Sequence, residues 1–258
     1  YPFLYRTNYR TWYDKSTPTP VSLNRNCQIY GEYKNTVQEF FVTAAFYYRH
    51  TRQNTLYGQV ISRDSTAYTR CRLNNRSEYW SFTGTLSKGF YDWRLKTSLN
   101  FSLSRSMGKQ LTNGLLQTYR YDYLKAEPRI IWSPVRSLEA EYHATFGYGG
   151  SKIGGKTRLS PLVDFVQRLH LTLNVGNFEL RLSGEHYRND LNSETHLNTL
   201  FADASLVYKS KKWRWEASLN NLFNKKEYAY TLYSATQSST SRLNIRPREA
   251  MITLSRQF

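Results

Sequence analysis

The chain lacks the features that mark the commonest membrane and secreted proteins. No stretch approaches the roughly 18 consecutive apolar residues that a membrane helix needs. Its only two cysteines, Cys27 and Cys71, match no metal-ligand spacing and are too few for a disulfide framework. The sequence leaves open whether the two pair or stay free. These absences exclude a helical membrane protein and a disulfide-stapled domain, but not a membrane protein that crosses with strands.

Acidic residues are also scarce, with 19 Asp and Glu against 36 Lys and Arg, so the net charge is +17. Such a charge is typical of proteins that bind nucleic acid or another polyanion. Here, however, the basic residues are spread along the chain without a block of five or six like charges. We therefore favour basic residues spread over polar surfaces and loops, and we expect no nucleic-acid partner. A soluble basic β-protein that binds nucleic acid is the alternative.

What the chain has in abundance is aromatic residues, at 16% of the sequence with 22 Tyr and 6 Trp. Tyr and Trp are favoured where one end of the side chain is apolar and the other is wet, as at a membrane interface. Five of the tryptophans fall near expected strand ends, which suits an interfacial girdle: Trp80, Trp93, Trp132, Trp213 and Trp215.

Apolar side chains alternate with polar ones over long segments, which is the pattern of extended strands. In residues 93–104, for example, Leu95, Leu99, Phe101 and Leu103 share one face and Lys96 lies on the other. The same pattern predicts that one polar face lines a lumen, with these residues on it: Arg94, Lys96, Glu139, Glu141, His143, Glu179, Arg181, Arg214 and Glu216. We predict no metal, cofactor or catalytic site.

The pattern predicts an all-β fold, a transmembrane antiparallel β-barrel with about twelve strands in this chain. We expect strands at 2–13, 26–34, 39–52, 66–87, 91–105, 115–132, 137–148, 158–175, 178–189, 196–209, 213–224 and 243–258. Several exceed the usual strand length, and short turns alternate with longer loops, as in outer-membrane barrels. Longer loops are expected near 14–25, 53–65, 106–117, 149–156, 189–196 and 227–241. A change of parity between Tyr123 and Ile130 predicts a β-bulge near Glu127 and Pro128.

Two motifs near the carboxyl end carry a resemblance to a known family. The run Leu219–Tyr228 reads L-N-N-L-F-N-K-K-E-Y; a Tyr-, Ser- and Thr-rich loop follows, and then Arg246-Pro247-Arg248 precedes a strand ending at Phe258. This arrangement resembles the end of TonB-dependent outer-membrane transporters, and the R-P-R version looks most like members from the Bacteroidetes. The motifs cover about the last forty residues, and the strand rhythm extends the likeness more weakly over the chain.

The resemblance implies a function and a set of partners. The family has a 22-stranded barrel plugged by a globular domain, and it imports scarce ligands such as metal chelates, vitamins, glycans or peptides. Residues 1–258 would be the carboxyl-terminal portion of such a barrel, without the plug. The implied partners are outer-membrane lipid and lipopolysaccharide, the plug and remaining strands, the TonB complex and the barrel-assembly machinery, with a surface lipoprotein as an optional addition. The chain begins at Tyr1, so we expect a processed protein or a fragment.

A few residues are candidates for specific roles. Loop aromatics gain nothing from lipid, so Tyr228, Tyr230 and Tyr233 are candidate ligand-binding residues. Alternate residues Ile252, Leu254 and Phe258 would form the terminal strand that the assembly machinery reads. A weak calcium candidate is formed by Asp190, Asn192 and Glu194. Alternatives to transport are a self-contained twelve-stranded pore, an outer-membrane hydrolase using His143 or His186, and a barrel scaffold in a surface complex.

Overall fold

The structure is a computed structural model, and it describes the chain except residues 1–3, 15–17, 191–195, 234–237 and 257–258. The described part is all-β, with 81% of residues in strands and no helix. The strands are β1 Leu4–Asn8, β2 Thr11–Asp14, β3 Ser22–Asn35, β4 Phe40–Gln53, β5 Leu56–Ile61, β6 Thr66–Cys71, β7 Asn75–Phe90, β8 Leu95–Thr112, β9 Leu115–Val135, β10 Leu138–Ile153, β11 Lys156–Val175, β12 Phe178–Asp190, β13 His196–Lys209, β14 Trp213–Asn220, β15 Glu227–Tyr233, β16 Ser238–Asn244 and β17 Glu249–Arg256.

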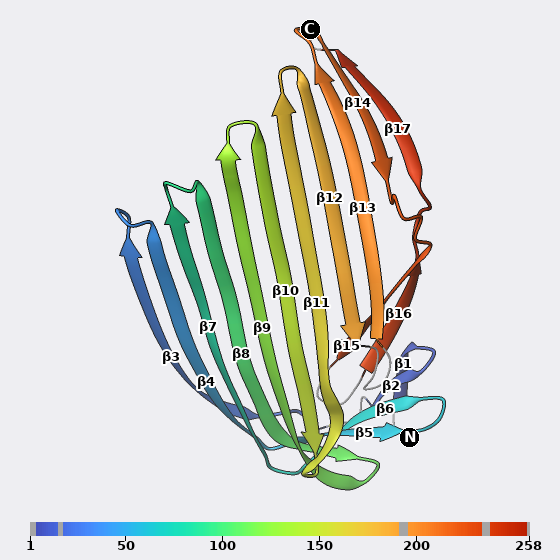
Figure 1. Cartoon of the computed structure of the whole chain (residues 1–258). Coiled ribbons are helices and arrows are strands. Elements are labelled where there is room, and N and C mark those ends of the chain that lie inside the picture. The colour runs from blue at the N-terminus through green and yellow to red at the C-terminus, as the bar shows by residue number, and fades with distance from the viewer. Residues whose placement is uncertain (1–3, 15–17, 191–195, 234–237, 257–258) are drawn as a thin grey trace.

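One large sheet dominates the molecule (Figure 1). It has 15 strands, and its curved wall consists of β3, β4, β7 to β14 and β17, each antiparallel to its neighbours. Within the described residues, β3 pairs only with β4 and β17 only with β14, so the wall has two open edges. Among the residues that the structure describes, no pairing between these edges closes the wall into a barrel.

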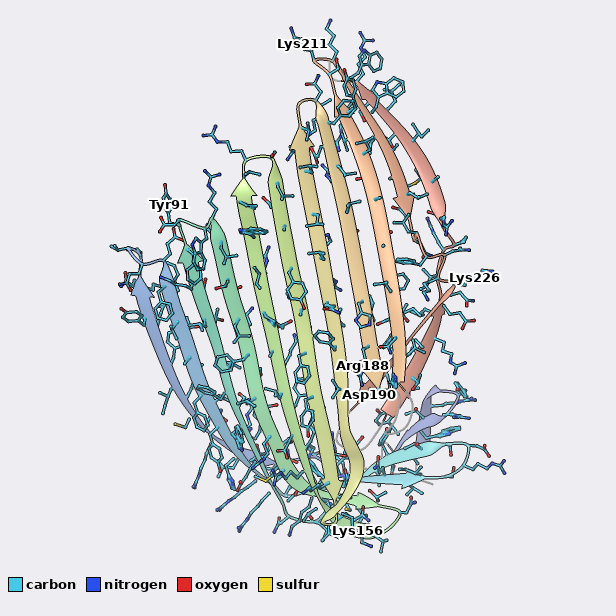
Figure 2. All side chains as sticks on the ribbon, viewed as in Figure 1. Tyr91, Lys156, Arg188, Asp190, Lys211 and Lys226 are labelled. Atoms are coloured by element: carbon cyan, nitrogen blue, oxygen red, sulfur yellow. The ribbon has the colours of Figure 1, made fainter. Side chains whose placement is uncertain are left out.

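The sequence prediction of short turns at one end of the wall is confirmed, whereas the other end has both longer connections and two-residue turns. Tyr91 and Lys211 mark turns at one end, whereas Lys156 and Asp190 lie at the other (Figure 2). We call these the short-turn end and the long-loop end. The long-loop end also carries a hairpin, β15–β16, and a four-stranded flap in which β5 pairs in parallel with the tip of β8 and β2 in parallel with β6.

Several sequence predictions of element bounds were wrong. The expected strand 2–13 is a hairpin of β1 and β2, and the expected strand 66–87 is split into β6 and β7. The loops expected at 106–117 and 149–156 are continuations of the strands, which turn only at Asn113-Gly114 and Gly154-Gly155. All four of these turn residues have positive φ, the conformation that two-residue hairpin turns require.

The bulge expected near Glu127 and Pro128 is also absent. β9 pairs with β8 without a register shift from Leu115 to Trp132, and its irregularity against β10 lies beyond Trp132. The change of parity arises because the tyrosines and the apolar residues lie on opposite faces. Tyr119, Tyr121 and Tyr123 share the face of Lys96, while Ile130 and Trp132 share the face of Leu95.

Following the register across the wall gives the sheet two chemically distinct faces. The apolar face carries a large exposed apolar side chain from every wall strand: Ile29, Phe46, Leu86, Leu103, Ile130, Tyr148, Leu169, Leu182, Leu206, Trp215 and Ile252. The opposite, polar face carries most of the buried polar side chains, among them Gln110, Ser151 and Glu179. Buried apolar side chains are few: Leu56, Ala144, Val207 and Ala229 among the described residues. Over the described residues the wall is thus one layer, without the second layer that normally covers a sheet.

Candidate functional site

The polar face gathers the residues that the sequence predicted to line a lumen. Lys96, Glu141, His143 and Arg181 all lie on it by register, as do Glu139, Glu179, Arg214 and Glu216. Arg94 lies in the turn between β7 and β8 with a positive φ of 48°. It nevertheless joins the group, because Arg94, Lys96, Glu139 and Glu141 line one hollow of about 790 Å³ at the short-turn end.

Most charges on this face are neutralised by neighbours. The Arg129 guanidinium forms an ion pair with the Glu141 carboxylate at 2.8 Å, and the Arg168 guanidinium lies 3.3 Å from the Glu185 carboxylate. Glu179 is 7% exposed and forms ion pairs with both Arg181 and Lys209. Such cross-strand and same-strand pairs stabilise a polar sheet face and leave it nearly balanced in charge.

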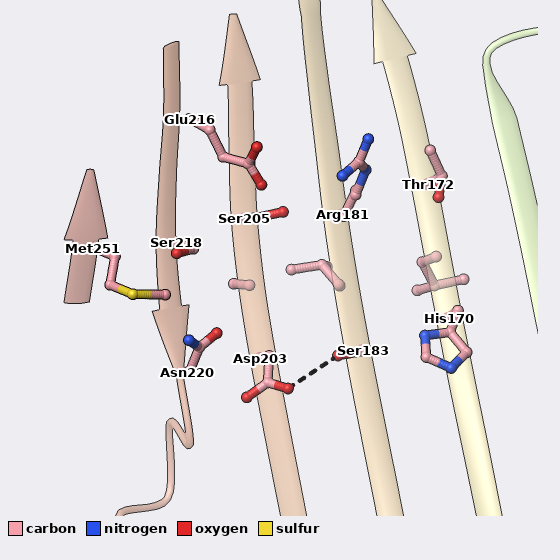
Figure 3. A pocket seen from close by; sticks show the side chains of 13 residues that line it. His170, Thr172, Arg181, Ser183, Asp203, Ser205, Glu216, Ser218, Asn220 and Met251 are labelled. Carbon is pink, nitrogen blue, oxygen red and sulfur yellow. Dashed lines mark hydrogen bonds between the residues drawn. The ribbon is translucent and has the colours of Figure 1, made fainter. Parts of the chain in front are cut away.

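A second hollow, of about 400 Å³, lies nearer the middle of β11 to β14 (Figure 3). His170, Arg181, Asp203 and Glu216 surround it, and Ser183 lies 3.5 Å from Asp203. It offers both donors and acceptors, so it suits passage or transient binding of a polar solute rather than of an apolar one.

Aromatic side chains form the third feature of the polar face, at the long-loop end. The β15–β16 hairpin lies against this face, because Tyr228 packs edge-on against Tyr187 of β12, with ring centroids 5.1 Å apart. Phe201 of β13 and Tyr230 complete the cluster, at 5.8 Å from Tyr187 and Tyr228 respectively. Partial burial raises the pKa of the Tyr228 hydroxyl above its usual range, and nearby Tyr187 adds to this.

Polar groups adjoin the aromatic cluster. Tyr187 donates a hydrogen bond to Glu185 and accepts one of 3.3 Å from Arg168. On β9, two strands away from β11, Tyr121 and Tyr123 stack with ring centroids 6.3 Å apart. Their rings lie across Gly149, where an added Cβ would approach the Tyr121 hydroxyl to 3.0 Å. The absence of a side chain at Gly149 therefore makes room for the two tyrosine rings on the polar face. The alternation of the sequence did not show which face of the sheet these tyrosines occupy.

The N-N-L-F-N run and the R-P-R segment meet at one buried residue, Asn221. Its side chain donates to the carbonyls of Lys225 and Arg246 at 2.8 and 2.9 Å and accepts from the Lys225 amide at 2.9 Å. Its own amide donates to Asp203 at 2.7 Å, and its φ is 53°. Asn tolerates this backbone conformation better than most residues. The motifs thus tie the end of β14 to the segment that enters β17.

Other candidate residues have more ordinary surroundings. Asp190 accepts a hydrogen bond of 2.9 Å from the Val163 amide, while Asn192 and Glu194 lie outside the described residues. His186 bonds Gln167 at 3.1 Å, on the opposite face from Glu185. In the described residues no cluster of three or more potential ligands could hold a metal ion. The thiols of Cys27 and Cys71 are both free.

The carboxyl-terminal and loop candidates are placed in part. Ile252 and Leu254 lie on the apolar face of β17, opposite Ala217 and Trp215, and both are exposed. Phe258 lies outside the described residues, as does the side chain of Tyr233. Tyr228 and Tyr230 belong to a strand, β15, rather than to an irregular loop.

Comparisons of the chain with protein-family models, with curated proteins and with solved structures return no match. Across the described residues, no helix has the length and apolar character needed to cross a membrane.

Proposed function

We propose that the chain forms part of the wall of an outer-membrane β-barrel and takes part in importing a ligand through its lumen. The observation that carries the proposal is the continuous, exposed apolar face. A single-layer sheet with this face in water would leave apolar surface far beyond the patches of ordinary soluble proteins. Lipid removes that cost, while the polar face keeps its contacts with water.

The height of the apolar band supports this placement. On β8 it runs from Leu95 to Leu103, and on β7 from Trp80 to Phe90, interrupted by Lys88 near the short-turn border, whose amine donates to the Gln38 carbonyl in the turn. At about 3.4 Å per residue and a tilt of about 40°, these segments rise roughly 21 to 26 Å. A barrel's apolar belt is about 25 Å tall. Trp132, Trp213 and Trp215 would lie in the girdle at the short-turn end, and Trp80 at the opposite border.

The polar face supports import rather than a merely structural role. It offers a charge-balanced surface with two hollows and a tyrosine-rich region at the long-loop end, where an external ligand would arrive. Tyr187, Tyr228 and Tyr230 would contact the ligand with ring faces and hydroxyls. The two open edges support completion of the barrel by strands outside residues 1–258, because lipid cannot satisfy their backbone groups.

The resemblance to TonB-dependent transporters extends the proposal to energised import in the bacterial outer membrane. The remaining strands, a plug, the TonB complex, the assembly machinery and, as an option, a surface lipoprotein would be partners. The terminal strand with Ile252 and Leu254 would then serve in assembly.

Cysteine accessibility tests the membrane placement. In a Cys27→Ser, Cys71→Ser background, Ser102→Cys and Leu103→Cys place thiols on opposite faces of β8. In outer membranes we expect a water-soluble maleimide to label position 102 and not position 103, and to label both after denaturation. Equal labelling of the two positions in folded protein would refute a lipid-facing apolar face.

Energised import is tested separately by genetics. Strains lacking this protein, TonB or both are compared on limiting metal chelates, vitamins, glycans and peptides. We expect the same uptake defect in all three strains for one ligand class. Uptake that persists without TonB but needs this protein would favour a passive pore.

A further inference from the structure

The net positive charge of the chain is not explained by the lumen-facing surface. On the polar face, cations and carboxylates nearly balance, as the ion pairs of Arg129, Arg168 and Glu179 illustrate. The apolar face is different beyond its apolar band. Toward the long-loop end it carries a cluster of basic residues, here called the basic belt: Arg76, Lys109, Arg120 and Lys152.

The basic belt surrounds a hollow of about 390 Å³ formed by β7 to β10. Its lining includes the four cations together with Glu78 and Met107. Glu78 lies 3.6 Å from His50, and Arg120 bonds Asp122 at 2.8 Å. Arg76, Lys109 and Lys152 form no ion pair with a described residue. The hollow therefore holds more positive charge than its acidic neighbours neutralise.

The register makes this excess costly for the sheet. Arg120 lies directly opposite Lys152, and Arg76 lies directly opposite Arg52 of β4. Like charges at directly opposed positions of neighbouring strands destabilise a sheet. An anion between them would convert repulsion into charge-assisted hydrogen bonds.

The location of the hollow indicates what kind of anion it takes. It opens on the same face as the apolar band, whose last apolar residue on β8, Leu103, lies four residues from Met107. That separation is roughly 14 Å along the strand. A molecule that fills the hollow with phosphate and covers the band with hydrocarbon is a phosphorylated lipid.

We propose that the basic belt is a binding site for the phosphate groups of an anionic lipid in the outer leaflet, with the acyl chains over the apolar face. The inference rests on the membrane placement proposed above. It goes further in naming the residues, the headgroup chemistry and the face of the wall. Arg76 and Lys152 would bind phosphate directly, and Arg120 would be shared between phosphate and Asp122.

The test uses the complete polypeptide in nanodiscs and measures binding of a bis-phosphorylated glucosamine lipid, lipid A. Arg76→Gln with Lys152→Gln removes two cations of the basic belt. The control, Arg136→Gln with Lys212→Gln, removes two exposed cations at the short-turn end. At about fivefold per basic residue near an anionic lipid surface, we expect a roughly 30-fold loss of affinity in the first variant and little change in the control.

Two further arms identify the ligand. Dephosphorylated lipid A should bind the wild type no better than it binds the belt variant. Inorganic pyrophosphate should compete only weakly, because it lacks the hydrocarbon. Equal affinities of the belt and control variants would overturn the site, and full competition by pyrophosphate would overturn the lipid in favour of a soluble anion. Failure of the protein to enter bilayers would refute the proposed function as well, whereas insertion without headgroup preference would refute the lipid site alone.

Discussion

An arginine placed at Leu99 tests the two-faced wall most directly. Leu99 lies on the apolar face of β8, opposite Leu86 and Pro128. It is four residues from each end of the band Leu95–Leu103, so it lies near the expected bilayer midplane. Arginine on the lipid face at this depth costs about 2–4 kcal/mol.

The neighbouring residue provides a matched control. Asn100 lies on the polar face, opposite Thr85 and Glu127. Asn100→Arg loses the 2.9 Å hydrogen bond with Thr85 but gains an opposite charge across from Glu127. We expect its stability to change by no more than about 1 kcal/mol, since cross-strand pairs contribute on that scale.

The assay is equilibrium unfolding of the complete protein in lipid vesicles by guanidinium, followed by tryptophan fluorescence. Leu99→Arg should lower the free energy of unfolding by about 3 kcal/mol, roughly a hundredfold change in the folded-to-unfolded ratio. Asn100→Arg should leave the midpoint almost unchanged. Equal destabilisation by the two arginines would show that the two faces do not meet different solvents and would refute the membrane placement.

Three further perturbations follow from local contacts. Asn221→Ala should lower the free energy of unfolding by about 2–4 kcal/mol, because it removes three hydrogen bonds made by a buried side chain at positive φ. Asn221→Gly should cost about 1 kcal/mol less, since glycine adopts this φ without strain, and equal unfolding midpoints for the two variants would contradict that backbone contribution. Tyr228→Ala should release the β15–β16 hairpin and speed its proteolysis several-fold, whereas Tyr228→Phe keeps the ring and should not. Identical cleavage rates for the alanine and phenylalanine variants would refute the packing of Tyr228 on Tyr187. Burial, helped by Tyr68 and Tyr13, raises the pKa of Tyr57 to about 12, so the flap should keep its stability below pH 10 and lose it as the pH rises toward 12. The tyrosinate absorbance that Tyr57→Phe removes identifies this residue, and a midpoint of that signal near pH 10 would contradict the prediction.

The strands were predictable wherever one face is apolar. Leu95, Leu99 and Leu103 alternate with polar residues, and a period of two allows only one local structure. The same rule failed where both faces are polar. In residues 106–112 the only apolar side chains are Met107 and Leu111, so the sequence predicts a loop there, yet β8 continues to Thr112 because β9 pairs with it to the end. Backbone hydrogen bonds between strands do not depend on side-chain polarity, so periodicity does not detect them.

The sequence by itself determined the all-β class, the alternation of the faces and the short turns at one end of the wall, because each depends on residues close together in the chain. Only the tertiary structure decided which distant residues meet. Register placed Arg76, Arg120 and Lys152 around one hollow, set Tyr228 against Tyr187, and joined Asn221 to Arg246. It also determined that the tyrosines of β9 share a face with the charges rather than with Trp132. The physical reason is that a shift of one residue in pairing would move every side chain of a strand to the other face, and pairing is settled between strands, not within them.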